Sequence, residues 1–167
     1  MRDLFEVIHE KQKMSESTHS TVGMVYPRWI EIRAHLEKFA DPIHFAFAHD
    51  IQKYLNRTAN GWNSRFERQV QVHHLLAYLL SPNNRTGFDQ LSQSSQQKVS
   101  EFLDEYGGSE AVNAFIDYIY QDGKFHPGNY CWKHIENEKT FWRLSVSNMS
   151  FDFRALLIFT SNQLIGA

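Results

Sequence analysis

The sequence predicts an all-α fold, and three observations lead to this prediction. Apolar residues recur three and four positions apart in several segments, which is the spacing of one helix face. Alternating runs of β-branched residues, the usual sign of strands, are nearly absent. Proline, glycine and short polar stretches separate the helical segments. We therefore expect an irregular bundle of several helices.

The composition predicts one soluble, intracellular domain. The chain has 167 residues, of which 42% are hydrophobic and 14% aromatic, enough for a single packed core. Its one cysteine, Cys131, cannot form an internal disulfide and fits a reducing compartment. The N-terminus is charged and unlike a signal peptide, and no apolar run is long enough to span a membrane. A net charge of −2 gives no overall basic field.

Residues 1–60 are predicted to form the N-terminal helices. The first covers roughly Arg2–Ser15, and the second begins near Pro27, a residue suited to a first helical turn. The second helix has an apolar stripe and a flank of charged residues that starts with Arg28. A third helix is expected within Ile43–Leu55, with a strand as the alternative for its first residues.

Residues 61–86 are predicted to contain the central buried helix. They hold the densest apolar run of the chain, at Val70, Val72, Leu75, Leu76, Tyr78, Leu79 and Leu80. Ser81-Pro82 should end this helix, because the residue before a proline is disfavoured in helical geometry. The adjacent His73 and His74 cannot face the same way, so we expect one to pack inward and one to meet solvent.

Residues 87–167 are predicted to form the C-terminal helices. Arg85–Ser95 is polar and is expected to be an exposed loop. A helix should follow, end at Gly107-Gly108, and give way to another that closes at Asp122-Gly123. Beyond these, the sequence predicts an aromatic cluster and a last apolar helix. The cluster consists of Tyr130, Trp132, Phe141, Trp142 and Leu144, and the last helix covers Phe153–Ile165.

One basic and aromatic group is a candidate nucleic-acid contact. It consists of Arg57, Trp62, Arg65, Arg68 and Arg85. Arginines can hold phosphates and a tryptophan can stack on a base, so this group would contact DNA. The alternative is that Trp62 belongs to the core and the arginines are ordinary surface residues.

The sequence assigns no catalytic residue, no metal ligand and no small-molecule substrate. Cys131 and His134 have the C-x-x-H spacing of half a zinc site, but a closed site needs four ligands. A buried thiol beside a surface histidine explains the same pattern. Neither G-x-G-x-x-G nor G-K-[ST] occurs, so no phosphate-binding loop is expected.

Several segments resemble the hAT-like transposases. The segment Ala77–Asn83, preceded by Trp-x-x-Arg from Trp62, is similar to a family block with Ala-Tyr, apolar residues, a small polar residue and proline. Gly23–Tyr26 resembles the segment that opens a long helix in that family. Tyr120–Phe125 and Trp132 resemble its later Gly-x-Phe and Trp positions. Phe141–Leu144 and the segment up to Ala167 resemble the approach to its dimerisation region.

This resemblance implies a fragment of a DNA-rearranging enzyme. The family has a ribonuclease-H-like core, in which two Asp and one Glu bind divalent metal, interrupted by a helical insertion. In this alignment the two Asp precede Met1 and the Glu follows Ala167. The chain would then be the helical insertion leading into the dimerisation region, inactive alone, with Mg or Mn needed only by the full-length enzyme. The resemblance implies DNA and a second copy of the chain as partners, and a nuclear location.

Two alternatives remain open from the sequence. The first is a helical protein-interaction module with no DNA role, which the net charge of −2 favours. The second is a zinc-stabilised helical domain built on Cys131 and His134.

Overall fold

The computed structural model describes residues 2–17, 20–39, 46–51 and 70–145. Within these ranges the chain forms helices and turns and no strand, so the predicted all-α multi-helix architecture is confirmed. The described α-helices include α1 (Arg2–Ser15), α2 (Val25–Leu36), α5 (Val72–Leu79), α6 (Gln93–Tyr120) and α7 (Glu138–Ser145). Residues 46–51 are also helical.

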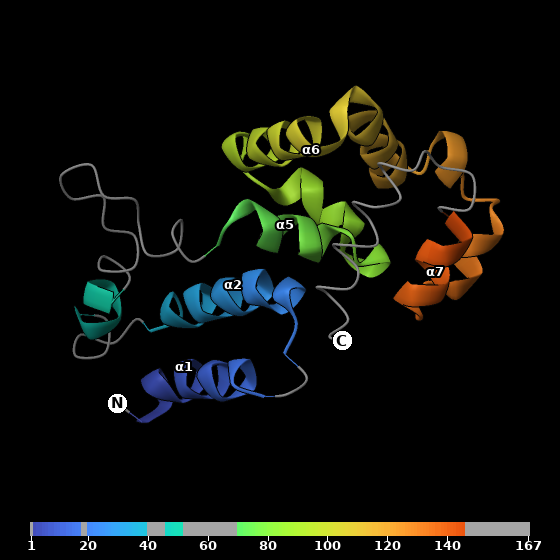
Figure 1. The fold of residues 1–167 in the computed structure, drawn as a ribbon. Coiled ribbons are helices and arrows are strands. Elements are labelled where there is room, and N and C mark those ends of the chain that lie inside the picture. Colours follow the sequence, from blue (N-terminus) through green and yellow to red (C-terminus); the bar gives the residue numbers. More distant parts are fainter. Residues whose placement is uncertain (1, 18–19, 40–45, 52–69, 146–167) are drawn as a thin grey trace.

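In the described part of the chain, 3-10 helices lie between these elements: η1 (Val22–Met24), η2 (Pro82–Gln90), η3 (Gly123–Phe125) and η4 (Tyr130–His134). In Figure 1, α1, α2, α5 and α6 lie in successive layers, and α7 lies to one side of the stack. No helix in the described ranges is long and apolar enough to cross a membrane.

Helix α2 lies between two hydrophobic clusters. On one side, Leu4 and Leu36 pack with Ala48 in a small cluster. On the other side, Trp29 packs against the main core. Helix α1 matches its predicted bounds, whereas α2 begins at Val25, two residues before Pro27. The N-terminal helices are therefore attached to the rest of the described fold through α2 and through η1, which packs on α5.

The main core forms around α5, as the apolar run predicted. Its buried members come from α5, η2, α6, η3, η4, α7 and the residues next to them: Val70, Leu75, Leu76, Ala77, Leu79, Leu80, Phe88, Leu91, Val99, Leu103, Ala111, Phe115, Tyr118, Ile119, Phe125, Cys131, Phe141 and Trp142. Helix α5 ends at Leu79, just before the Ser81-Pro82 pair that was expected to stop it.

The prediction of an exposed loop at Arg85–Ser95 is wrong. Pro82–Gln90 is a 3-10 helix, and α6 already begins at Gln93. Phe88 is buried against the Phe115 ring, with ring centroids 5.5 Å apart. Gly87 lies so close to Tyr78 that a Cβ at this position would be 2.8 Å from Tyr78 Cε1. The burial of Phe88 and the close packing at Gly87 therefore make this polar stretch part of the core.

The glycine pair at Gly107-Gly108 separates two helical stretches, as predicted. Helix α6 continues from Gln93 to Tyr120, with a kink at Gly108 (φ 63°, ψ −171°). This backbone conformation is essentially restricted to glycine. The two predicted helices therefore meet at Gly108, and the label α6 covers both.

Candidate functional site

Four of the five residues of the predicted DNA-contacting group lie outside the described residues. These are Arg57, Trp62, Arg65 and Arg68, and the structure says nothing about their neighbours. Arg85 is described and lies on η2, partly buried.

Arg85 contacts the C-terminal end of α6. Its guanidinium donates one hydrogen bond to the Ile119 carbonyl oxygen (2.8 Å) and another to Gln121 Oε1 (2.8 Å). A positive charge at this end complements the helix dipole. The guanidinium also lies 5.4 Å from the ring centroid of Trp132, within cation–π range. Arg85 therefore holds η2, α6 and η4 together, and its proposed contact with DNA stays a prediction.

The end of α5 is the point where distant parts of the chain are joined. The Tyr118 hydroxyl donates to the Leu79 carbonyl (2.9 Å), and Trp142 Nε1 donates to the Leu80 carbonyl (2.9 Å). Ser81 Oγ hydrogen-bonds to Glu138. The last carbonyls of a helix have no partner within the helix, so these donors satisfy groups that would otherwise be buried and unpaired.

Tyr118 is at the centre of an aromatic cluster. It is 1% exposed, and its ring lies near five others, those of Phe115, Phe125, Trp132, Phe141 and Trp142. Burial raises the pKa of its hydroxyl well above 10.0; the Arg85 charge lowers it in part, and Glu138 raises it further. The hydroxyl therefore stays protonated and remains a donor.

The predicted aromatic cluster is correct for three of its five members. Phe141 and Trp142 are buried, and Trp132 donates from Nε1 to the Phe125 carbonyl (2.8 Å). Tyr130 and Leu144 instead point outward, with 61% and 40% of their surface exposed. Tyr130 lies at the first position of η4, where the turn directs it away from the core.

The two adjacent histidines differ in burial, as predicted. His73 is exposed and His74 is half-buried, with ring centroids 4.1 Å apart. His74 Nδ1 accepts a hydrogen bond from the Gln71 backbone N–H (2.9 Å), which caps the start of α5. Burial, followed by the neighbouring His73, lowers the pKa of His74. Its neutral form is the one that can accept this bond.

The C-x-x-H pair is divided between the core and the half-exposed surface. Cys131 is 4% exposed within the main core, and His134 is half-buried with its ring 5.0 Å from the Tyr130 ring. Among the described residues, no group of three or more His, Cys, Asp or Glu side chains is placed to hold a metal ion. The zinc alternative stays a prediction.

Sequence reasoning missed one unusual charged residue, Arg28. It was expected on the solvated flank of its helix, yet it is only 7% exposed. Its guanidinium donates to Ser15 Oγ (2.9 Å) and Ser20 Oγ (2.8 Å) and approaches Met24 Sδ (3.3 Å). The cation is thus held by neutral acceptors between the end of α1 and the start of α2. Helical periodicity places Arg28 beside Trp29, but it gives no sign of the loop that covers it.

Comparison with known proteins finds no match to this chain: no family model, no curated protein and no solved structure is detectably similar.

Proposed function

We propose that this chain is a transposase-derived helical scaffold, catalytically inactive by itself, that contacts DNA and self-associates. The proposal starts from the sequence resemblance to hAT-like transposases, carried mainly by Ala77–Asn83 and Phe141–Leu144. A scaffold of this kind would hold nucleic acid and a second copy in place, while the metal-binding carboxylates of the family lie outside the aligned span.

One observation supports treating the resembling segments as one functional unit. Ala77–Asn83 and Phe141–Leu144 are about 60 residues apart, yet Trp142 Nε1 donates to the Leu80 carbonyl, with a sequence separation of 62. Ser81 and Glu138 add a second link between the same two regions. Trp132, from a third resembling segment, stacks parallel to Tyr118 at 6.3 Å. The motifs therefore share one core.

Two assays test this proposal together. The full chain is incubated with plasmid and with oligonucleotide duplexes in Mg²⁺ or Mn²⁺, and nicking and strand transfer are measured; we expect neither. DNA binding is then measured by fluorescence anisotropy from 25 to about 200 mM salt, where a phosphate-contacting surface loses affinity steeply. Cleavage by the purified chain would disprove the inactive scaffold, and no binding at the lowest salt would remove the DNA contact.

A specific surface favours the second candidate, a protein-interaction module without a DNA role. Phe5 on α1 and Phe47 in the helical segment 46–51 are 41% and 46% exposed, and their ring centroids lie 6.3 Å apart. Neighbouring exposed aromatic residues are enriched at protein interfaces. The double substitution Phe5→Ser with Phe47→Ser should abolish any concentration-dependent association in sedimentation velocity. If association persists unchanged, this surface is not the interface.

A further inference from the structure

Two tyrosines on the described surface are equally exposed but differ in their surroundings. Tyr106 on α6 and Tyr130 on η4 each have 61% of their surface exposed. Large aromatic side chains with such exposure present a flat face that can stack on a ligand. Their neighbours therefore decide which ligand each could accept.

The surroundings of Tyr130 are basic. Lys133 Nζ lies over the Tyr130 ring, 5.3 Å from its centroid, and the His134 ring meets the Tyr130 ring edge-on at 5.0 Å. From Gly123 to Ile135 the sequence contains two lysines and two histidines and no carboxylate. In sequence, the nearest acidic residues are Asp122 and Glu136 at its two ends, and Asp122 Oδ1 accepts from the Gly123 N–H (2.7 Å). In space, the Asp117 carboxylate of α6 also lies beside Gly123.

The surroundings of Tyr106 are acidic. Asp104 and Glu105 immediately precede it, and Glu101 and Glu110 lie on the same helix within five residues. Its ring contacts Phe102, with centroids 4.6 Å apart. A polyanion would be repelled here. The pair thus offers an internal comparison between one aromatic side chain in a basic setting and one in an acidic setting.

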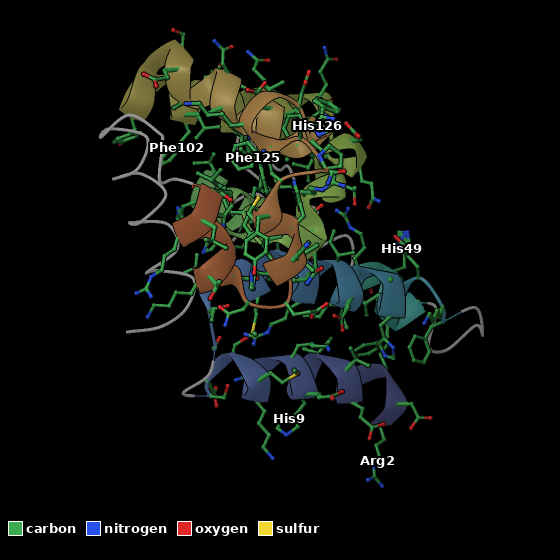
Figure 2. The ribbon with its side chains drawn as sticks, turned by 90° about the vertical axis from the view of Figure 1, so that its right-hand side faces the viewer. Arg2, His9, His49, Phe102, Phe125 and His126 are labelled. Atoms are coloured by element: carbon green, nitrogen blue, oxygen red, sulfur yellow. The ribbon has the colours of Figure 1, made fainter. Side chains whose placement is uncertain are left out.

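The turn that carries Tyr130 is firmly attached to the core. Cys131, the next residue, is 4% exposed, and Trp132 donates from Nε1 to the Phe125 carbonyl. In Figure 2, which faces the α7 side of the molecule, Phe125 and His126 are labelled next to each other; Phe125 is buried and His126 is exposed. Phe125 and Cys131 therefore fix the two ends of a turn whose intervening residues 126–130 are all exposed, and Lys133 beyond Cys131 is exposed as well.

We propose that Tyr130, with Lys133 beside it, binds single-stranded nucleic acid. The ring would stack on an unpaired base, and Lys133 Nζ would neutralise a phosphate next to that base. An unpaired base is favoured over a duplex because the faces of paired bases are already covered by their neighbours. This inference rests on the DNA contact in the proposed function and places part of it on η4.

The test measures binding of the full chain to a fluorescein-labelled 15-nucleotide oligo-dT by anisotropy at 50 mM salt. Oligo-U of the same length and a 15-base-pair duplex are the other probes. We expect oligo-dT and oligo-U to bind more tightly than the duplex. Tyr130→Ala should weaken oligo-dT binding at least about five-fold, because base–aromatic stacking contributes roughly 1–3 kcal/mol. Lys133→Ala should weaken it and lower the salt slope by about 0.7, the value for one phosphate contact on a single strand.

Tyr106→Ala is the matched control, because it removes an equally exposed tyrosine from an acidic setting. It should leave the affinity unchanged, whereas Tyr130→Phe should keep most of it. Equal affinity of the Tyr130→Ala variant and the wild type would overturn the inference, as would tighter binding of the duplex.

The same data separate this inference from the proposed function. If wild type binds no probe, both the DNA contact and the Tyr130 site are wrong. If wild type binds and only the triple substitution Arg57→Ala, Arg65→Ala and Arg68→Ala reduces the affinity, the DNA contact stands and the Tyr130 site is wrong.

Discussion

Replacing Tyr118 with phenylalanine tests the central junction of the fold. The substitution keeps the ring and its aromatic contacts but removes the hydroxyl that donates to the Leu79 carbonyl at 2.9 Å. Because Tyr118 is 1% exposed, water cannot replace the lost donor. An unsatisfied buried acceptor costs about 1–3 kcal/mol, so Tyr118→Phe should lower the free energy of unfolding by that amount at pH 7.

The same substitution should have a smaller effect at high pH. Burial raises the pKa of Tyr118 well above 10.0, whereas the unfolded chain ionises near that value. Above pH 10 the unfolded state therefore binds fewer protons than the native state, and the contribution of Tyr118 to stability declines as pH rises. Phenylalanine has no such dependence, so the difference between the two proteins should shrink between pH 9 and pH 11.

Urea unfolding followed by circular dichroism at 222 nm measures both effects. The other tyrosines are common to wild type and variant and cancel in the difference. Tyr106→Phe is the control, because that side chain is 61% exposed and should change stability by less than about 0.5 kcal/mol. A Tyr118→Phe cost no larger than that of the control at pH 7, or one that grows towards pH 11, would refute the buried hydrogen bond.

Four further changes test other parts of the structure. Gly108→Ala should lower the free energy of unfolding in urea by about 1–3 kcal/mol, because φ is 63° and ψ −171° at this residue. Gly107→Ala, the control, should be neutral or stabilising. Equal costs of the two substitutions would contradict the kink. Gly87→Ala should destabilise by about 1–3 kcal/mol, since the new Cβ would lie 2.8 Å from the Tyr78 ring, and an unchanged melting temperature would contradict that packing. Arg85→Gln should lower the free energy of unfolding by about 1–3 kcal/mol, because the hydrogen bonds to Ile119 and Gln121 at the end of α6 are lost. An unchanged free energy of unfolding would contradict these two hydrogen bonds. Because the pKa of His74 is lowered in the native state, the free energy of unfolding of the wild type falls as pH drops below 6.5. His74→Ala should therefore show a flatter pH dependence of stability between pH 7 and 5. Parallel curves for the two proteins would contradict the lowered pKa.

Local sequence signals predicted the helices whose pattern is contained within a few turns. The apolar spacing from Leu4 to Ile8 gave α1, and the run from Val72 to Leu79 gave α5 together with its end before Pro82. These predictions succeed because a helix face and a proline stop depend only on nearby residues.

The junction at the end of α5 depends on contacts that periodicity does not encode. The donors to the Leu79 and Leu80 carbonyls come from Tyr118 and Trp142, which are 39 and 62 residues away. Arg28 is another example, because its guanidinium donates to the hydroxyls of Ser15 and Ser20, which are 13 and 8 residues away. As for the candidate site, Arg85 alone of the five predicted residues is described, and its neighbours are likewise distant in sequence.

The net charge of −2 does not describe the local field, because the charges are unevenly distributed along the chain. Helix α6 carries five carboxylates and one lysine, a net charge of −4 in a chain whose total is −2, so the remaining residues carry +2. A phosphate backbone responds to the local field within about 10 Å at ordinary salt, and it would be repelled by α6 but attracted by Lys133 beside Tyr130. If the proposed nucleic-acid contact exists, this charge distribution disfavours an approach over α6 and favours the turn with Tyr130 and Lys133. Charge reversal makes the argument testable: Glu105→Lys should strengthen oligo-dT binding only slightly, while Lys133→Glu should nearly abolish it. Equal and opposite effects would mean that the strand responds to total charge and not to the Tyr130 surface.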